Sequence, residues 1–388
     1  MKKPVFFKRK PAPESPALLQ TGRTVTHPFS VLDRYVPLGK GEAALYDAIR
    51  EAVPLVDAAI GKIVALTGGF TLACDDPALQ TALNDFALAV PVSGGGYGLD
   101  TFIRRYLDQL LTYGTAVGEV LPTADGGGVH SLHNVPLQGL EILRDPLHGA
   151  GQVCLQTPNG PVPAPYPELL VYSALDPKPG QVTGNSLLKG LPFVTGILLK
   201  IYNTIGVNFE RLGNLRFAVT YRPTGDAADR GPAKDRAMQI AQAWRAAMRD
   251  DRSGRVSDFI AVGDVDIKVI GADNQALDTQ VPVRQMLEQI VAKTGLPPFI
   301  LGLSWSTSER MAAQQTDMLT TELWNYRRQL TPVIQKIAGL WLRLQGANLP
   351  CRVVWDDISL QDEVATANAA YLRMKTNLLE QQWKEQRA

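Results

Sequence analysis

The chain has 388 residues, of which 45% are hydrophobic and 20% are charged, a composition that can fill the cores of two or three globular domains. The formal net charge is only +1, so the total charge gives no general attraction to nucleic acid. These values exclude a wholly disordered chain and a strongly basic nucleic-acid binder. Any contact with DNA must be local, or must be passage without tight binding.

Three cysteines, Cys74, Cys154 and Cys351, are odd in number and far apart along the chain. Their spacing predicts neither a disulfide framework nor a zinc site, and it is typical of a reducing cytoplasm. The basic first ten residues precede no apolar run of signal-peptide length, and no uncharged apolar stretch reaches the roughly 18 residues of a membrane span. We therefore expect a soluble intracellular protein with no membrane partner.

The first half of the chain predicts a flexible arm followed by helices and a sheet. Residues 1–40 are rich in proline, serine, threonine and basic residues, which favours an extended arm. Apolar residues at helical spacing predict helices over 44–66, 77–89 and 99–113. The glycine-rich run 92–98 predicts a flexible link between the last two helices. Strands are expected at 70–72, at 116–122 and at several places within 123–180.

The second half predicts longer helices separated by a strand-rich insertion. We expect helices over 187–212, 233–248 and 282–293, and strands over 215–223 and within 259–270. A loop at 302–308 precedes a helical pattern over 309–345, about 55 Å long if continuous. Pro332 should kink that helix because proline removes a backbone donor. A strand at 351–355 and a helix over 361–386 end the chain.

The sequence predicts no catalytic residue and no cofactor. The glycine clusters 94–96 and 126–128 lack the Lys-Ser/Thr pair that follows them in a phosphate-binding loop, and no serine lies in a Gly-x-Ser-x-Gly motif. The acidic pairs at 75–76, 250–251 and 356–357 lie at expected turns or helix ends, where aspartate commonly caps backbone donors.

Histidines offer the only conceivable metal site. His130 and His133 are three residues apart, and His148 and Cys154 lie downstream. The segment reads as a loop followed by strands, and no acidic residue has the spacing that would complete a zinc motif. We therefore expect no bound metal. A metal-dependent hydrolase that uses His130 and His133 stays open as an alternative.

Basic residues cluster in two kinds of place. The arm carries five between Lys2 and Lys10, which can contact nucleic acid or an acidic partner, or can simply be solvated. The pairs Arg104–Arg105 and Arg327–Arg328 lie on predicted helices. We expect each pair to form a solvated helix face, and a role facing a channel is the alternative.

The order of several short motifs resembles that of the portal proteins of tailed bacteriophages. Residues 99–120 (LDTFIRRYLDQLLTYGTAVGEV) resemble the family's helix, Tyr-Gly and strand signature. Residues 54–63 (PLVDAAIGKI) look like its preceding helix, and 184–188 (GNSLL) resemble its Gly-x-Ser-x-Leu turn. Residues 295–302 (GLPPFILG) are similar to its Val-Pro-Pro-x-x-Leu-Gly stretch. A Ser/Thr-rich loop and a proline-containing helix follow in the family's order.

The resemblance implies an α+β, portal-like fold with an α/β wing, a two-helix stem, a small α/β clip, a long kinked helix and a short helical crown. The implied division is a flexible arm at 1–40, the wing at 41–190, a stem helix at 191–212, the clip at 213–281, a second stem helix at 282–299, the tunnel loop at 300–308, the kinked wing helix at 309–349 and the crown at 350–388. Only one helix fits after Asp357, whereas larger relatives have crowns of several helices.

The resemblance also implies a function in a virion, at one capsid vertex, for a protein assembled in the host cytoplasm. About 12 copies would form a ring whose channel serves DNA packaging, retention and ejection. The implied partners are other copies of the chain, double-stranded DNA, the terminase, the head–tail adaptor and the major capsid protein. A closed ring of heterologous contacts suits a chain without a catalytic constellation, and near-zero net charge suits DNA that must slide.

The implied DNA-channel residues form one loop. It contains Gly302, Leu303, Ser304, Trp305, Ser306, Thr307 and Ser308. Ser308 is placed to cap the following helix, and Trp305 lies either near the tip of the loop or packed in the subunit core. A scaffold or adaptor that forms no pore is the other alternative to a portal.

Overall fold

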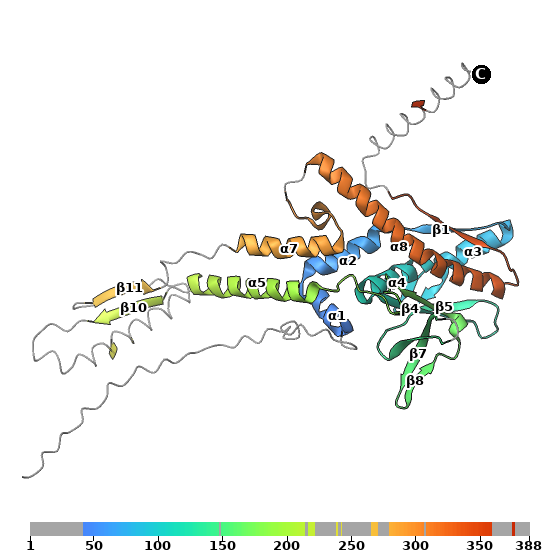
Figure 1. Ribbon diagram of the computed structural model, residues 1–388, viewed down its shortest axis with the longest axis horizontal. Helices are drawn as coiled ribbons and strands as arrows, with labels where there is room; N and C mark the ends of the chain where they lie inside the picture. The colour runs from blue at the N-terminus through green and yellow to red at the C-terminus, as the bar shows by residue number, and fades with distance from the viewer. Residues whose placement is uncertain are drawn as a thin grey trace, which may run out of the picture.

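The computed structural model describes residues 42–146, 149–213, 216–221, 265–270, 279–305 and 308–358, with short pieces at 238–239, 242 and 375–376. The protein is an α+β structure with a body of helices and sheets, from which two long helices project side by side (Figure 1). Predictions for the arm at 1–40, the helix at 233–248 and the helix at 361–386 fall mostly or wholly outside these residues. Among the described residues, no helix is both long and apolar enough to cross a bilayer.

Helices form most of the body, and two of them, α5 and α7, project from it (Figure 1). The helices are α1 (Glu42–Ala52), α2 (Pro54–Leu66), α3 (Pro77–Ala89), α4 (Leu99–Tyr113), α5 (Leu191–Gly213), α7 (Gln280–Thr294) and α8 (Glu309–Leu344), with 3-10 turns η2 (Pro167–Leu169) and η3 (Pro298–Leu301). The predicted helices at 77–89 and 99–113 are confirmed with these bounds. Gly114 ends α4 in the left-handed conformation that glycine adopts most readily.

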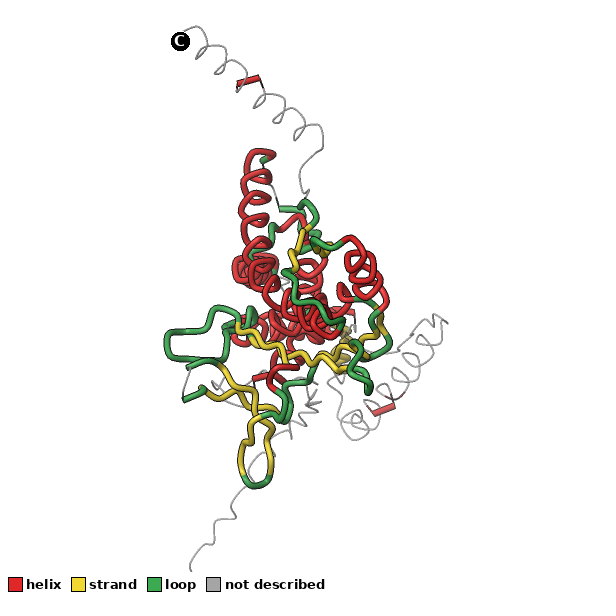
Figure 2. Tube along the Cα trace, turned by 90° about the vertical axis from the view of Figure 1, so that its right-hand side faces the viewer, coloured by secondary structure: helices red, strands yellow, loops and turns green. Residues whose placement is uncertain are grey.

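Strands form four small sheets. They are β1 (Phe70–Cys74), β2 (Pro91–Val92), β3 (Gly96–Tyr97), β4 (Thr115–Pro122), β5 (Val129–Asn134), β6 (Leu140–Arg144), β7 (Gly151–Thr157), β8 (Gly160–Pro163), β9 (Leu170–Ala174), β10 (Arg216–Tyr221), β11 (Val265–Ile270) and β12 (Cys351–Trp355). Their orders are β3-β2-β5-β4-β9, β6-β7-β8, β1-β12 and β10-β11. The β7–β8 hairpin projects from the body, as the end-on view shows (Figure 2).

One continuous hydrophobic core joins the helices of the body. Helix α4 contributes a full stripe, with Phe102, Tyr106 and Leu110 all completely buried. Helix α8 adds a second stripe, and α2 contributes Val56, Ile60 and Ile63 to the same core. Because the buried positions of α4 recur every three or four residues, its sequence dictates which face meets the sheet.

Two predictions for the first hundred residues need correction. The expected helix over 44–66 is two helices, because Pro54 has no N–H and forces Val53 into an extended conformation. The expected flexible link at 92–98 is a β2–β3 hairpin. Three residues connect the strands, and two of them, Gly94 and Gly95, have φ values of +80° and +82°, which glycine adopts readily.

The predicted strand at 351–355 packs against the helical body. It is β12, which pairs antiparallel with β1 and packs beside α8. Its inner residues Val353 and Trp355 contact the hydrophobic core.

Helix α8 runs unbroken across Pro332 from Glu309 to Leu344. Thr331 lies beside the proline, and its hydroxyl donates to the carbonyl of Arg327 and accepts from the indole N–H of Trp355. The predicted long helix is thus confirmed, the kink at Pro332 stays a prediction, and Trp355 of β12 bonds the helix beside that proline.

Candidate functional site

Helices α5 and α7 form a stalk that leaves the body, and the β10–β11 pair lies beyond its far end (Figure 1). Large apolar side chains on these helices remain exposed, including Phe193 (62%), Phe209 (71%) and Val281 (56%). Apolar side chains of this size exposed on both helices of the stalk make it a candidate surface for contact with another chain. The stalk, its base and the loop after α7 together form the candidate site.

The base of the stalk is built on the C-terminal end of α4. The last carbonyls of a helix have no partner within the helix and need one from elsewhere. Gly114 N–H donates to Leu110, Leu187 N–H donates to Leu111 at 2.9 Å, and the Ser186 hydroxyl donates to Thr112 at 2.6 Å. The turn that leads into α5 therefore closes α4, and this contact orients the stalk relative to the body.

Glycines permit this contact. A Cβ on Gly114 would lie 2.5 Å from both the carbonyl carbon of Asn185 and the amide nitrogen of Ser186. A Cβ on Gly184 would collide with the carbonyl oxygen of Gly114. Two motifs that the sequence analysis found separately, at 99–120 and at 184–188, thus meet backbone to backbone.

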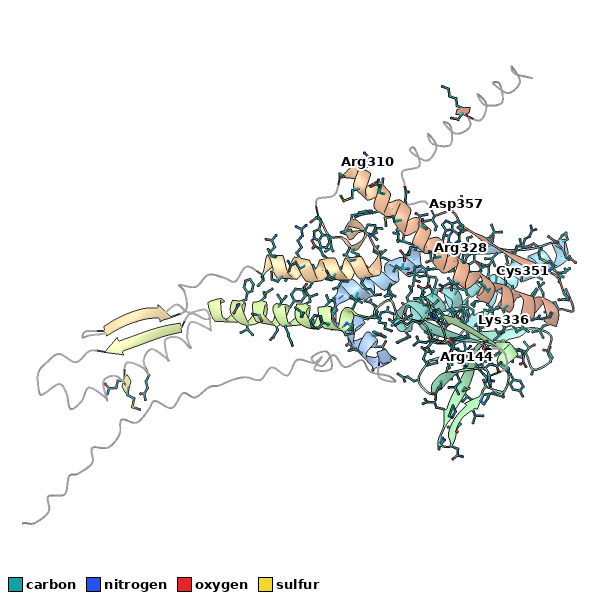
Figure 3. All side chains as sticks on the ribbon, viewed as in Figure 1. Arg144, Arg310, Arg328, Lys336, Cys351 and Asp357 are labelled. Carbon is teal, nitrogen blue, oxygen red and sulfur yellow. The ribbon has the colours of Figure 1, made fainter. Side chains whose placement is uncertain are left out.

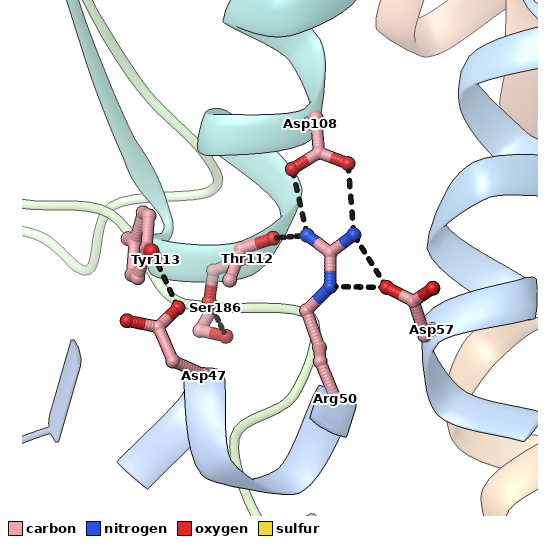
Figure 4. A network of polar contacts seen from close by, with 7 residues as sticks. All are labelled: Asp47, Arg50, Asp57, Asp108, Thr112, Tyr113 and Ser186. Atoms are coloured by element: carbon pink, nitrogen blue, oxygen red, sulfur yellow. Dashed lines mark hydrogen bonds and ion pairs between the residues drawn. The ribbon is translucent and has the colours of Figure 1, made fainter. Parts of the chain in front are cut away.

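A polar network fastens α1 and α2 to the same end of α4 (Figure 4). The Arg50 guanidinium donates to both carboxylate oxygens of Asp108, at 2.6 and 3.1 Å, and to Asp57 at 2.8 Å. Burial alone would lower the pKa of Arg50, but its hydrogen bond and charge interaction with Asp108 raise it above the usual value. A second bond joins the Tyr113 hydroxyl to Asp47 at 2.6 Å. Tyr113 is the tyrosine of the Tyr-Gly signature, but no role in this network was predicted from the sequence for any of these side chains.

The loop after α7 is held at both ends. Gly295 ends α7 in the left-handed conformation, and Leu296 is buried (1% exposed). The turn η3 then ends at Gly302, whose φ is +75°, and the Leu303 N–H donates back to Pro298 at 3.0 Å. At the far end, Ser308 caps α8, accepting the Met311 N–H at 3.3 Å, as the sequence predicted.

Trp305 lies back against the stalk. Its ring is partly exposed, and the Arg284 guanidinium of α7 lies 5.6 Å from the ring centroid, a cation–π arrangement. Arg284 also forms an exposed ion pair with Glu288 at 2.9 Å. Trp305 is therefore neither part of the core cluster nor free of the stalk. Ser306 and Thr307 lie outside the described residues.

Arg327 corrects one prediction. Arg328 is exposed on α8 (Figure 3), but Arg327 is only 1% exposed and lies between the rings of Trp324 and Trp355, at 4.9 and 5.1 Å. Its Nε donates to the carbonyl of Thr67, which ends α2, at 2.8 Å. Burial lowers the pKa of Arg327, and the charges of Asp356 and Asp357 partly offset this effect. A solvated face was expected because adjacent arginines are usually exposed. However, Arg327 continues the buried spacing of Leu323, Leu330 and Ile334.

The residues considered for enzyme chemistry do not come together. His130 is exposed, and the ring of His133 hydrogen-bonds the Ser131 hydroxyl at 3.0 Å. In the described part of the chain, which omits His148, no group of three or more His, Cys, Asp or Glu side chains could hold a metal ion.

The predicted capping role of the acidic pairs is confirmed for Asp76 but not for its neighbour Asp75. Asp76 caps α3 as predicted, whereas Asp75 forms an ion pair with Arg352 at 3.1 Å. Asp250 and Asp251 lie outside the described residues. The carbonyl of Gly69 accepts the Asp356 backbone N–H at 3.1 Å, which extends the β1–β12 pairing.

The fold is similar to that of chains in particles that carry a neck. A chain in the neck of an empty gene transfer agent (GTA) particle, computed with C6 symmetry, is 13% identical, with a TM-score of 0.62 over 87% of this chain and 90% of that one. A chain in the neck of the native GTA particle, computed with C12 symmetry, is 15% identical, with a TM-score of 0.52 over 84% and 89%. The protein therefore has the fold of a particle-neck component.

A third likeness is to a portal protein of the HK97 phage family from Corynebacterium diphtheriae. It is 13% identical over 78% of this chain and 92% of that one, but its TM-score of 0.42 is too low to add to the argument. No family of protein sequences matches the chain. No curated protein matches it in sequence. The portal-type fold predicted from the motif order is confirmed by the neck structures at the level of the fold.

Proposed function

We propose that the protein is a portal subunit, a component of the ring at one capsid vertex of a virion. Copies of the chain associate through heterologous contacts that close into a ring of about 12 subunits around an axial channel. Double-stranded DNA passes through the channel during packaging and ejection and is retained between these events. The likeness to neck structures computed with C6 and C12 symmetry supports a ring.

The observation that carries this proposal is the exposed apolar surface of the stalk. Phe193, Phe209 and Val281 would each expose half or more of their side chains if the chain acted alone. In a ring, the stalk of one subunit covers that of the next, and burial of apolar area supplies the association free energy at roughly 25 cal/mol per Å². Met311 and Met318, near the start of α8, are exposed as well.

Substitutions in the stalk test the proposal. Replacing Phe209 and Phe193 with lysine should leave a folded chain, because both side chains are already exposed, but should prevent ring closure. Val162, half exposed on the β7–β8 hairpin, provides a matched control, and Val162→Lys should still form rings. Light scattering coupled to gel filtration separates the two results. Normal rings from the Phe193→Lys, Phe209→Lys variant would refute a stalk interface.

The rest of the division follows from the same proposal. Residues 41–190 form the wing, the stalk forms the stem, and 213–281 form a clip that faces the head–tail adaptor. The loop from Gly302 to Ser308 borders the DNA. Its described residues carry no charge, so the loop itself supplies no lysine or arginine to bind phosphate and hold a sliding duplex. The terminase and the major capsid protein are the remaining partners, and assembly takes place in the host cytoplasm.

Neither alternative function gains support from a specific observation. A metal-dependent hydrolase would need ligands around His130 and His133, and His133 is instead bonded to a serine. A scaffold or adaptor without a pore would not explain why Phe193, Phe209 and Val281 are left exposed on the two antiparallel helices of the stalk (Figure 1).

A further inference from the structure

Two of the three cysteines lie opposite each other in the β1–β12 pair. Cys74 ends β1 and Cys351 begins β12, and the antiparallel register pairs them directly. Neither forms a disulfide in the structure. Residues that are directly opposed on antiparallel strands have side chains on the same face of the pair. For these two cysteines that face is the inner one, because both contact the hydrophobic core.

The hydrogen bonds show that this is a close pair. The Asp356 N–H donates to the Gly69 carbonyl at 3.1 Å, so bonded and non-bonded residue pairs alternate from that point along the strands. Cys74 and Cys351 fall on a non-bonded pair. Consistent with this position, the Cys74 N–H donates to the Gln80 side chain, and the Cys351 carbonyl accepts from Gln335. Non-bonded pairs have Cα atoms about 4.5 Å apart, within the roughly 4.4–6.8 Å that a disulfide spans.

We propose that Cys74 and Cys351 form an oxidation site, a dithiol that low-molecular-weight disulfides convert to an intrachain disulfide. The partly exposed Cys74 attacks as its thiolate and forms a mixed disulfide, releasing one small thiol. Cys351 then loses its proton and attacks the Cys74 sulfur, releasing the second small thiol. The two cysteines are oxidised, and one small disulfide is reduced to two thiols.

The bond would fasten the C-terminal end of the described body to its N-terminal part. Strand β12 follows α8 and is held by backbone pairing with β1, by the packing of Val353 and Trp355 against the core, and by an exposed ion pair with Asp75. A disulfide would prevent β12 from separating from β1. A reducing cytoplasm keeps such thiols reduced, so the bond would form only once the protein reaches an oxidising medium. This inference does not depend on the proposed function.

The test is oxidation of the full-length protein with oxidised glutathione, followed by peptide mapping without reduction. We expect a linked peptide pair containing Cys74 and Cys351, lighter than the two free peptides by two hydrogen atoms. The oxidised protein should unfold at a temperature higher by roughly 5 °C, a shift that a reducing agent abolishes.

Cys154 supplies the matched control, because it is buried on β7 and is a free thiol. Cys154→Ser should still form the bond, whereas Cys74→Ser and Cys351→Ser should not. Mapping of the wild-type protein remains decisive if a variant fails to fold. Glutathione that stays on Cys74 while Cys351 is free would overturn the proposal, and so would bonds that join different chains.

Discussion

The carbonyl oxygen of Gly114 occupies the space into which any side chain at residue 184 would extend. That oxygen also accepts the Leu175 N–H at 2.8 Å, so the end of β9, the end of α4 and the start of the stalk meet at one point. The direction of the stalk relative to the body therefore depends on backbone contacts that only glycine allows.

Gly184→Ala should destabilise the protein strongly. The new methyl group would overlap backbone atoms of Gly114 and Leu175, and backbone cannot rotate away as a side chain can. We expect a loss of roughly 3 kcal/mol or more in the free energy of unfolding, measured by chemical denaturation. Gly61→Ala is the control, since nothing lies within 4 Å of a Cβ there and Gly61 is in helix α2. Gly61→Ala should raise the free energy of unfolding by about 0.5–1 kcal/mol. Equal changes in the free energy of unfolding for Gly61→Ala and Gly184→Ala would contradict this account.

Arg327→Ala should cost roughly 3 kcal/mol in the free energy of unfolding, because it removes the bond to Thr67 and leaves a gap between two indole rings. Arg328→Ala changes an exposed neighbour on the same helix and should cost less than about 0.5 kcal/mol. Urea denaturation of both variants gives the comparison. Similar losses would show that Arg327 is not the junction between α8 and α2.

The protein should lose stability above about pH 10. Burial raises the pKa of Tyr172 to about 12, and burial together with Asp47 raises the pKa of Tyr113. Each folded-state pKa lies above the unfolded value near 10, so the folded protein holds more protons than the unfolded chain in the range between them. The stabilisation is complete below about pH 10 and falls as the pH rises toward 12.

Tyr172→Phe should reduce the loss of stability between about pH 10 and pH 12. Tyr97→Phe changes an exposed side chain and should leave the dependence of stability on pH as in the wild type. Melting temperatures measured from pH 8 to pH 12 provide the test. A Tyr172→Phe profile that matches the wild type would show that Tyr172 does not cause the decline.

Substitutions in the loop from Gly302 to Ser308 should reduce DNA packaging or retention without preventing ring formation. Replacing Trp305, Ser304 and Ser306 with glycine removes the contact with Arg284 but no part of the hydrophobic core. We expect intact rings and reduced packaging or retention of the genome, measured as protected DNA per particle. Arg284→Ala keeps the loop residues and tests whether the contact positions Trp305. Normal DNA content in the glycine variant would show that this loop is not the gate.

The sequence predicted the helices and the class of fold well, because both depend on local patterns. The stripe on α4 and the caps at Asp76 and Ser308 can be recognised from neighbouring residues alone. The split at Pro54 was also visible, because proline at a helix start restricts the preceding residue, but the apolar spacing across it suggested one helix.

Long-range contacts account for what the sequence did not predict. Cys74 and Cys351 are at distant points of the chain, and only the pairing of β1 with β12 brings them together. The Arg50 network likewise joins three helices, and no local motif identifies it. The burial of Arg327 could have been predicted, because the residue continues the helical spacing of the buried residues on α8. Its charge and the adjacent Arg328 instead favoured the prediction of an exposed side chain.

Single-particle imaging of the purified full-length protein tests the central claim most directly. Our account predicts closed rings of about 12 subunits, with stalk helices α5 and α7 packed between neighbours around an axial channel. The loop from Gly302 to Ser308 should line that channel. A protein that remains monomeric at high concentration, or that forms only two-fold dimers, would contradict it.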